Sequence, residues 1–111
     1  MSDIWTPVKG EKVKMTTTKR RISGGLQVMS VRLVEVREIT KAGYVRVSDG
    51  LRDKFKRAGD RSFAERHRKS DVFIDFHTTI EPATPDEIAR IPTDMAGARE
   101  YARSLTHEAT L

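Results

Sequence analysis

The side chains in this sequence that are most readily used for catalysis or metal binding are three histidines, His67, His77 and His107. They are 10 and 30 residues apart, so none of them shows the close spacing along a helix with which paired histidines bind a metal ion. Their positions in a basic segment, at a strand end and near the C-terminus favour three separate, partly exposed histidines. The sequence therefore predicts no metal site and no other cofactor.

Asp75 and His77 offer the one catalytic pair, because residues two apart on a strand share a face and a carboxylate there can orient an imidazole. A hydrolase would also need a nucleophile, and neither Ser70 nor Thr79 lies in a nucleophile elbow or a glycine-rich turn. The segment Ser23-Gly24-Gly25 lacks the residues that follow in a phosphate-binding loop, and indicates a flexible hairpin loop. We expect a protein that is not an enzyme, with a hydrolase centred on Asp75 and His77 as the alternative to test.

Basic residues gather in two clusters, Lys19 to Arg21 and Arg52 to Lys69. A lysine or arginine that meets a phosphate releases condensed counterions, and Phe55 and Phe63 within the second cluster would provide stacking surfaces if they were exposed. The alternative is that Phe55 is a core residue and the cluster is a solvated, self-repelling surface. The predicted nucleic-acid-binding residues are Lys19, Arg20, Arg21, Arg52, Lys54, Lys56, Arg57, Arg61, Arg66, Arg68 and Lys69.

The two ends of the chain carry opposite charge. Residues 1–70 contain 18 lysines and arginines against 8 acidic residues, whereas residues 71–111 contain 3 against 8. The first part therefore has a net charge of +10 and the second −5, within a total of +5. A positive field concentrated on part of a small protein favours acidic partners, either a nucleic acid (DNA or RNA) or an acidic protein surface.

Length and composition predict one domain over residues 1–111, with a β-barrel part at about 5–80 and a helical part at about 84–106. The absence of cysteine excludes disulfides and thiolate metal sites. No apolar run approaches the roughly 20 residues that span a bilayer, and the first residues lack the layout of a signal peptide. We expect a cytoplasmic protein without a membrane partner.

Alternating apolar and polar residues, together with turn glycines, predict five short antiparallel strands joined by loops. The predicted strands lie at residues 8–15, 26–40, 44–47, 51–55 and 72–76. Residues 16–25 are predicted to form a basic loop and residues 56–70 a long polar one. In the second strand, Val31 and Leu33 share one face while Val34 and Val36 share the other, which favours a bulge or a sharp coil.

The C-terminal part changes to helical spacing. Thr84, Pro85 and Glu87 predict a capping box at a helix start, and Pro92 predicts a break, giving one helix to about Ile91 and a longer one from about Asp94 to Leu105. One apolar stripe follows both helices. Its members are Ile88, Ile91, Met95, Ala98, Ala102 and Leu105.

Two aromatic residues outside the clusters have open roles. Trp5 is predicted to close one end of the core, with an exposed anchor for a partner as the alternative. Tyr44 opens a strand beside a turn, and neither role is favoured for it.

The expected order of elements resembles SH3-like small barrels, through Gly10-Glu11-Lys12-Val13 and through the strand, turn and strand from Val36 to Val47. This resemblance implies an α+β, mainly β fold with about five antiparallel strands followed by one or two helices. The size, basicity and lack of catalytic motifs are similar to those of small bacteriophage accessory proteins, which use such barrels to bind host proteins or nucleic acid. Fold alone does not set function.

The leading expectation is a binding module that engages nucleic acid through its basic loops. The rival is a small phage-type inhibitor or adaptor that binds a host protein through the apolar stripe, including a homodimer. Ala98 and Ala102 favour that sub-case, because small residues permit the close approach of another helix.

Overall fold

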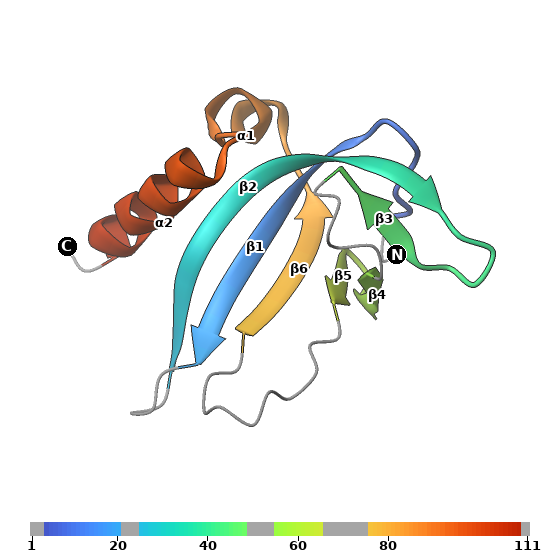
Figure 1. The fold of residues 1–111 in the computed structure, drawn as a ribbon, viewed down its shortest axis with the longest axis horizontal. Coiled ribbons are helices and arrows are strands. Elements are labelled where there is room, and N and C mark those ends of the chain that lie inside the picture. The colour runs from blue at the N-terminus through green and yellow to red at the C-terminus, as the bar shows by residue number, and fades with distance from the viewer. Residues whose placement is uncertain (1–3, 21–24, 49–54, 66–75, 110–111) are drawn as a thin grey trace.

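The computed structural model describes residues 4–20, 25–48, 55–65 and 76–109. The described ranges form six strands and two helices: β1 (Lys12–Arg20), β2 (Leu26–Ile39), β3 (Val45–Val47), β4 (Phe55–Gly59), β5 (Ser62–Glu65), β6 (Phe76–Pro82), α1 (Pro85–Arg90) and α2 (Met95–Ala109). Each strand pairs antiparallel with the next, and β6 pairs with β1 to close a barrel (Figure 1). The predicted fold class, α+β and mainly β with C-terminal helices, is confirmed.

Two segments predicted as loops form strands instead. Residues 16–20 continue β1, which pairs with β2 on one side and β6 on the other. Within the segment 56–70, the described residues form the β4–β5 hairpin, in which Arg57 lies opposite Phe63. The loop prediction weighed overall polarity, but a strand needs apolar residues on one face only, and Phe55 and Phe63 provide that face. Of the predicted strand 72–76, only Phe76 lies among the described residues, where it begins β6.

The long strand β2 is buried on both faces. Its pairing with β1 is continuous from Ser30 to Glu35, so successive side chains alternate without a slip. Val34 and Val36 point into the barrel core, whereas Val31 and Leu33 join a second apolar cluster with α2. The change of face inferred from the sequence therefore reflects two cores, one on each side of the same strand.

The bulges in β2 lie nearer its two ends. Against β1 the register shifts so that Met29 is the extra residue, and against β3 the extra residue is Arg37. The first shift brings Val28 to the face of the second cluster. An extra residue at Met29 reverses the side that Val28 faces relative to the residues after the bulge. These two bulges are consistent with the strong curvature of β2 around the barrel in Figure 1.

Both helices begin where their sequences predict. The Glu87 backbone N–H donates to Thr84 Oγ1 at 3.2 Å and the Thr84 N–H donates to Glu87 Oε1 at 3.1 Å, which completes the capping box of α1. That helix ends as Ile91 turns to extended geometry before Pro92. At the start of α2, the Gly97 N–H donates to Asp94 Oδ2 at 2.8 Å, and the helix continues to Ala109, beyond the predicted end at Leu105.

A short ion pair joins α1 to the barrel. Lys14 Nζ on β1 donates to Glu87 Oε2 at 2.6 Å, and the side chains keep 25% and 27% of their surface exposed. This hydrogen bond, followed by the one from the Thr84 N–H, lowers the pKa of Glu87 from its ordinary value of 4.5. The carboxylate thus serves both as a helix cap and as an anchor on β1.

Candidate functional site

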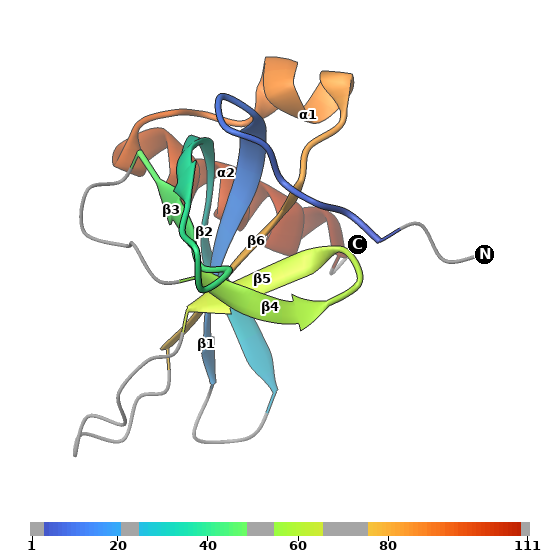
Figure 2. The ribbon, with the colours of Figure 1, turned by 90° about the vertical axis from the view of Figure 1, so that its right-hand side faces the viewer.

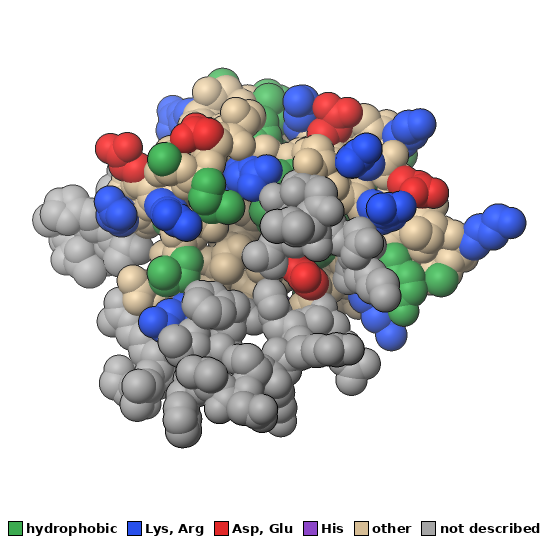
Figure 3. Space-filling model, viewed as in Figure 1, with side chains coloured by type: hydrophobic (Ala, Val, Ile, Leu, Met, Phe, Trp, Pro, Cys, Tyr) green, Lys and Arg blue, Asp and Glu red, His purple; other side chains and the backbone are tan. Residues whose placement is uncertain are grey.

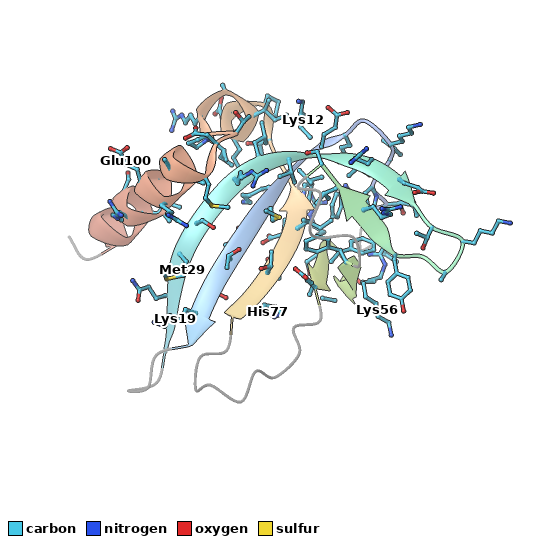
Figure 4. The ribbon with its side chains drawn as sticks, viewed as in Figure 1. Lys12, Lys19, Met29, Lys56, His77 and Glu100 are labelled. Carbon is cyan, nitrogen blue, oxygen red and sulfur yellow. The ribbon has the colours of Figure 1, made fainter. Side chains whose placement is uncertain are left out.

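The structure describes the side chains of four of the eleven predicted nucleic-acid-binding residues, namely Lys19, Lys56, Arg57 and Arg61. Arg20 ends β1, and the other six lie outside the described residues: Arg21, Arg52, Lys54, Arg66, Arg68 and Lys69. Lys19 and Lys56 lie on opposite sides of the lower edge in Figure 4. The basic residues of the β4–β5 hairpin therefore form a site separate from Lys19.

Arg57 on β4 is held by neutral groups. Its Nη1 donates to the carbonyl oxygens of Gly59 at 3.0 Å and Asp60 at 3.3 Å, and its Nη2 donates to that of Trp5 at 2.8 Å. The guanidinium carbon lies 4.6 Å from the centre of the Phe63 ring, within the range of a cation–π contact. Since a guanidinium has five N–H donors, these contacts leave two donors and the full positive charge of Arg57 for a further partner.

The N-terminal segment packs against the β4–β5 hairpin and helps to hold Arg57 in place. The Trp5 N–H donates to the Asp60 carbonyl at 2.8 Å, which fixes the segment along the hairpin turn. The Trp5 ring meets Phe63 edge-on, with centroids 5.7 Å apart, and its Nε1 donates to Glu11 Oε2 at 2.9 Å. Trp5 packs on the barrel core as predicted, and it also positions the carbonyl that Arg57 uses.

A depression of about 380 Å³ lies beside Arg57, between the β2–β3 turn and β4. Its apolar walls come from Pro7, Ile39, Val45 and Phe63, and Lys56 and Arg57 are the charged residues among those that line it. The sequence did not reveal this site, because its walls come from segments far apart along the chain. Thr6, Ala42 and Gly43 complete the lining.

The depression forms because β3 and β4 pair over a single residue. Val45 opposite Phe55 is their one pairing among the described residues, and beyond it the hairpin of β4 and β5 diverges from the β2–β3 turn (Figure 2). Gly43 shapes that turn with a φ of +90°, a conformation that favours glycine. A Cβ built on Gly43 would meet nothing within 4 Å, so the space over the turn is open.

Neighbouring charges differ between this site and other basic residues. Lys12, Lys14 and Arg46 each form an ion pair with a glutamate. Among the described residues, no carboxylate forms an ion pair with Lys56, Arg57 or Arg61. Elsewhere, acidic and basic side chains of the described residues lie interspersed over the upper part of the face in Figure 3.

Three of the six residues in the predicted apolar stripe are buried against the rest of the protein. Ile91 and Ala102 are buried in the cluster with Val31 and Leu33, and Ala98 is also fully buried. The burial of these three residues thus corrects the expectation that they contact a partner. The stripe members that remain exposed are Ile88, Met95 and Leu105.

Among the three histidines and Asp75, the structure describes the side chain of His77. His77 is exposed at the start of β6, where its carbonyl accepts from Thr18 Oγ1 at 3.3 Å, and Asp75, His67 and the side chain of His107 lie outside the description. Within the described ranges, no three histidine, aspartate or glutamate side chains are arranged to hold a metal ion. No helix in these ranges has the length and apolar character needed to cross a membrane.

Together, the fold and the site define a small closed antiparallel barrel with two C-terminal helices and a surface depression at the seam between β3 and β4. This architecture is compatible with an SH3-like small barrel. Comparison of the chain with models of protein families, with curated proteins and with solved structures found no match.

Proposed function

We propose that this chain is a non-enzymatic binding module that engages nucleic acid through its phosphates. The observation that carries the proposal is the fixed guanidinium of Arg57, which is held by three carbonyls and has no carboxylate partner among the described residues. A guanidinium placed in advance loses little conformational entropy when it binds, and its fork of donors matches the oxygens of a phosphate.

Neighbouring charge supports the same function. Lys56 lies next to Arg57 on the depression, and Arg61 is exposed in the turn of the same hairpin. The chain as a whole carries a net charge of +5. Such a field raises the rate at which an anionic polymer meets the protein, and releasing counterions from that polymer provides much of the binding free energy.

Fluorescence anisotropy with short DNA and RNA strands, in a series from low to moderate salt, tests this proposal. The affinity should fall steeply as salt rises, since each phosphate contact contributes about −0.7 to the slope of log K against log salt for single strands. Lys56→Ala should make that slope shallower by about 0.7. Arg57→Lys should weaken binding while keeping the slope, because lysine retains the charge and loses the fork.

Arg103→Ala is the matched control, since Arg103 is an exposed arginine on α2 and its loss changes the net charge as much as Lys56→Ala does. The control should bind with nearly the affinity and slope of the wild type. Absence of binding, affinity that does not respond to salt, or an equal effect of Arg103→Ala and Lys56→Ala would overturn the proposal.

A second function is favoured by the exposure of Ile88, Met95 and Leu105, which keep 41%, 38% and 39% of their surface. Three apolar side chains exposed on two consecutive helices suit a protein partner. We propose as the alternative a small inhibitor or adaptor of the bacteriophage type that binds a host protein in the cytoplasm, including as a homodimer. Light scattering that gives a monomer mass at high concentration would contradict the homodimer, and capture of a partner from nuclease-treated extract would favour a protein over nucleic acid.

A further inference from the structure

We propose that the depression between the β2–β3 turn and β4 receives one unpaired base, while Lys56 and Arg57 hold its phosphate, so that the protein binds single strands in preference to duplexes. This inference rests on the proposed function and names the form of nucleic acid that the site takes. A base inside a duplex is stacked and paired, and can enter a pocket only after it is extruded, whereas a single strand presents unstacked bases directly.

The walls of the depression suit a flat, largely apolar ring. Pro7, Val45 and Phe63 are apolar but buried and form its floor, whereas Ile39, with 41% of its surface exposed, is the accessible apolar wall. The volume of about 380 Å³ lies near the lower end of the range for pockets that bind small molecules, about 300–1,000 Å³. The open space over Gly43 leaves room for a ring to lie against the turn.

The positive charges on the lining indicate that the ring carries an anionic group. Lys56 and Arg57 line the depression without an acidic residue beside them on the lining, so an occupant with an anionic group is favoured. Arg57 retains two donors beyond its three carbonyl contacts. A planar ring that carries a phosphate a short distance away combines both requirements in a single nucleotide.

An extended peptide with acidic residues is the competing occupant, and the strands beside the depression favour it less. Peptides that add to a sheet gain affinity from main-chain hydrogen bonds along a free strand edge. Here β3 has only three residues, and it is already paired with β2 on one side and with β4 through Val45 on the other. A nucleotide needs no such ladder.

Binding of three labelled probes of equal length tests the inference: a single-stranded oligothymidylate, an abasic strand with the same phosphates, and a duplex. The single strand should bind at least about five-fold more tightly than the abasic strand, a difference set by the contact of one base, and more tightly than the duplex. Ile39→Gln makes one wall polar without changing charge. It should reduce the preference for the strand with bases while leaving the salt dependence unchanged.

Ile88→Gln is the matched control, because Ile88 has the same 41% exposure and lies on α1. It should keep the full preference, and circular dichroism should give both variants the wild-type fold. Equal binding of the abasic and base-containing strands, or duplex binding as tight as that of the single strand, would overturn this inference and leave the proposed function in place. Failure of all three probes to bind would overturn both this inference and the proposed function.

Discussion

Replacement of Glu87 by glutamine tests whether the charge on this residue stabilises the packing of the helices on the barrel. In the wild type, Glu87 accepts from Lys14 at 2.6 Å and completes the capping box with Thr84. Glutamine keeps one side-chain oxygen, which can still accept from the Thr84 N–H, but its amide NH₂ replaces the Oε2 that accepts from Lys14, and the negative charge is lost. The substitution therefore removes the ion pair with Lys14 and the charge at the start of α1, while the capping hydrogen bonds with Thr84 can persist.

The expected magnitude follows from exposure and position. The side chains of Lys14 and Glu87 are 25% and 27% exposed. Ion pairs that water still reaches contribute roughly 0.2–1 kcal/mol to the free energy of unfolding. A negative charge in the first turn of a helix adds about 0.3–1 kcal/mol through the helix dipole. Allowing for partial overlap of the two effects, Glu87→Gln should lower the free energy of unfolding by about 1 kcal/mol near neutral pH.

The loss should depend on pH in a defined direction. Because the folded state lowers the pKa of Glu87 below its ordinary value of 4.5, the carboxylate stabilises the protein fully above that value. This contribution is lost as the pH falls through the folded pKa. The difference between wild type and Glu87→Gln should therefore be largest near pH 7 and shrink toward zero in acid.

Urea unfolding followed by circular dichroism, in steps from pH 7 to about pH 3, measures this difference. With slopes of about 1–3 kcal/mol per molar urea for small proteins, a loss of about 1 kcal/mol moves the midpoint by roughly 0.5 M. Glu100→Gln is the control, since Glu100 is exposed on α2 and has no partner among the described residues. A loss for Glu87→Gln that stays constant across pH, or no loss near neutral pH, would refute this electrostatic account.

Three further substitutions test the packing. Gly97→Ala should destabilise the protein by about 1 kcal/mol in urea unfolding, although alanine favours helices, because its Cβ would lie 2.8 Å from the Pro92 Cβ; a gain in stability would show that the chain yields easily there. Ala98→Leu, at a fully buried position, should lower the free energy of unfolding by about 1–3 kcal/mol. Ala96→Leu, at an exposed position on the same helix, should have little effect. Similar thermal midpoints for the two variants would contradict the packing of α2 on β2. Trp5→Phe should cost about 1 kcal/mol through its lost indole hydrogen bond, and an unchanged urea midpoint would show that this bond contributes nothing.

The sequence predicted the elements whose signals are local. Thr84, Pro85 and Glu87 define the start of α1 through contacts within one turn, and Pro92 separates the helices through its own geometry. The long strand from Leu26 was equally clear from its β-branched residues. In these places the neighbouring residues alone determine the backbone.

The hairpin of β4 and β5 was missed because its stability depends on distant contacts. Phe63 is buried only because the barrel closes over it, with Ile80 opposite on β6. Apart from Ala64, the residues around it in the chain are mostly polar, so composition favoured a loop. The same reason hid the candidate site, since Pro7, Ile39 and Arg57 become neighbours only when three separate segments meet.

The basic residues were predicted as two clusters along the chain, and the described ones lie in places with different surroundings. Lys19 lies far from the hairpin in Figure 4. Arg57 is distinguished by the carbonyls that hold it, which no count of charges could reveal. Charge patterning identified the kind of partner to test, and the backbone around the hairpin identified where to test it.

The two buried faces of β2 have a consequence for any shortened form of this protein. Val31 and Leu33 are covered by α2 and the segment before it, while Val34 and Val36 are covered by the other strands. Cutting the chain before α1 would expose an apolar stripe in the middle of the longest strand, where it would promote aggregation. The barrel and helices should therefore melt in a single cooperative transition, and neither part should persist as a stable fragment.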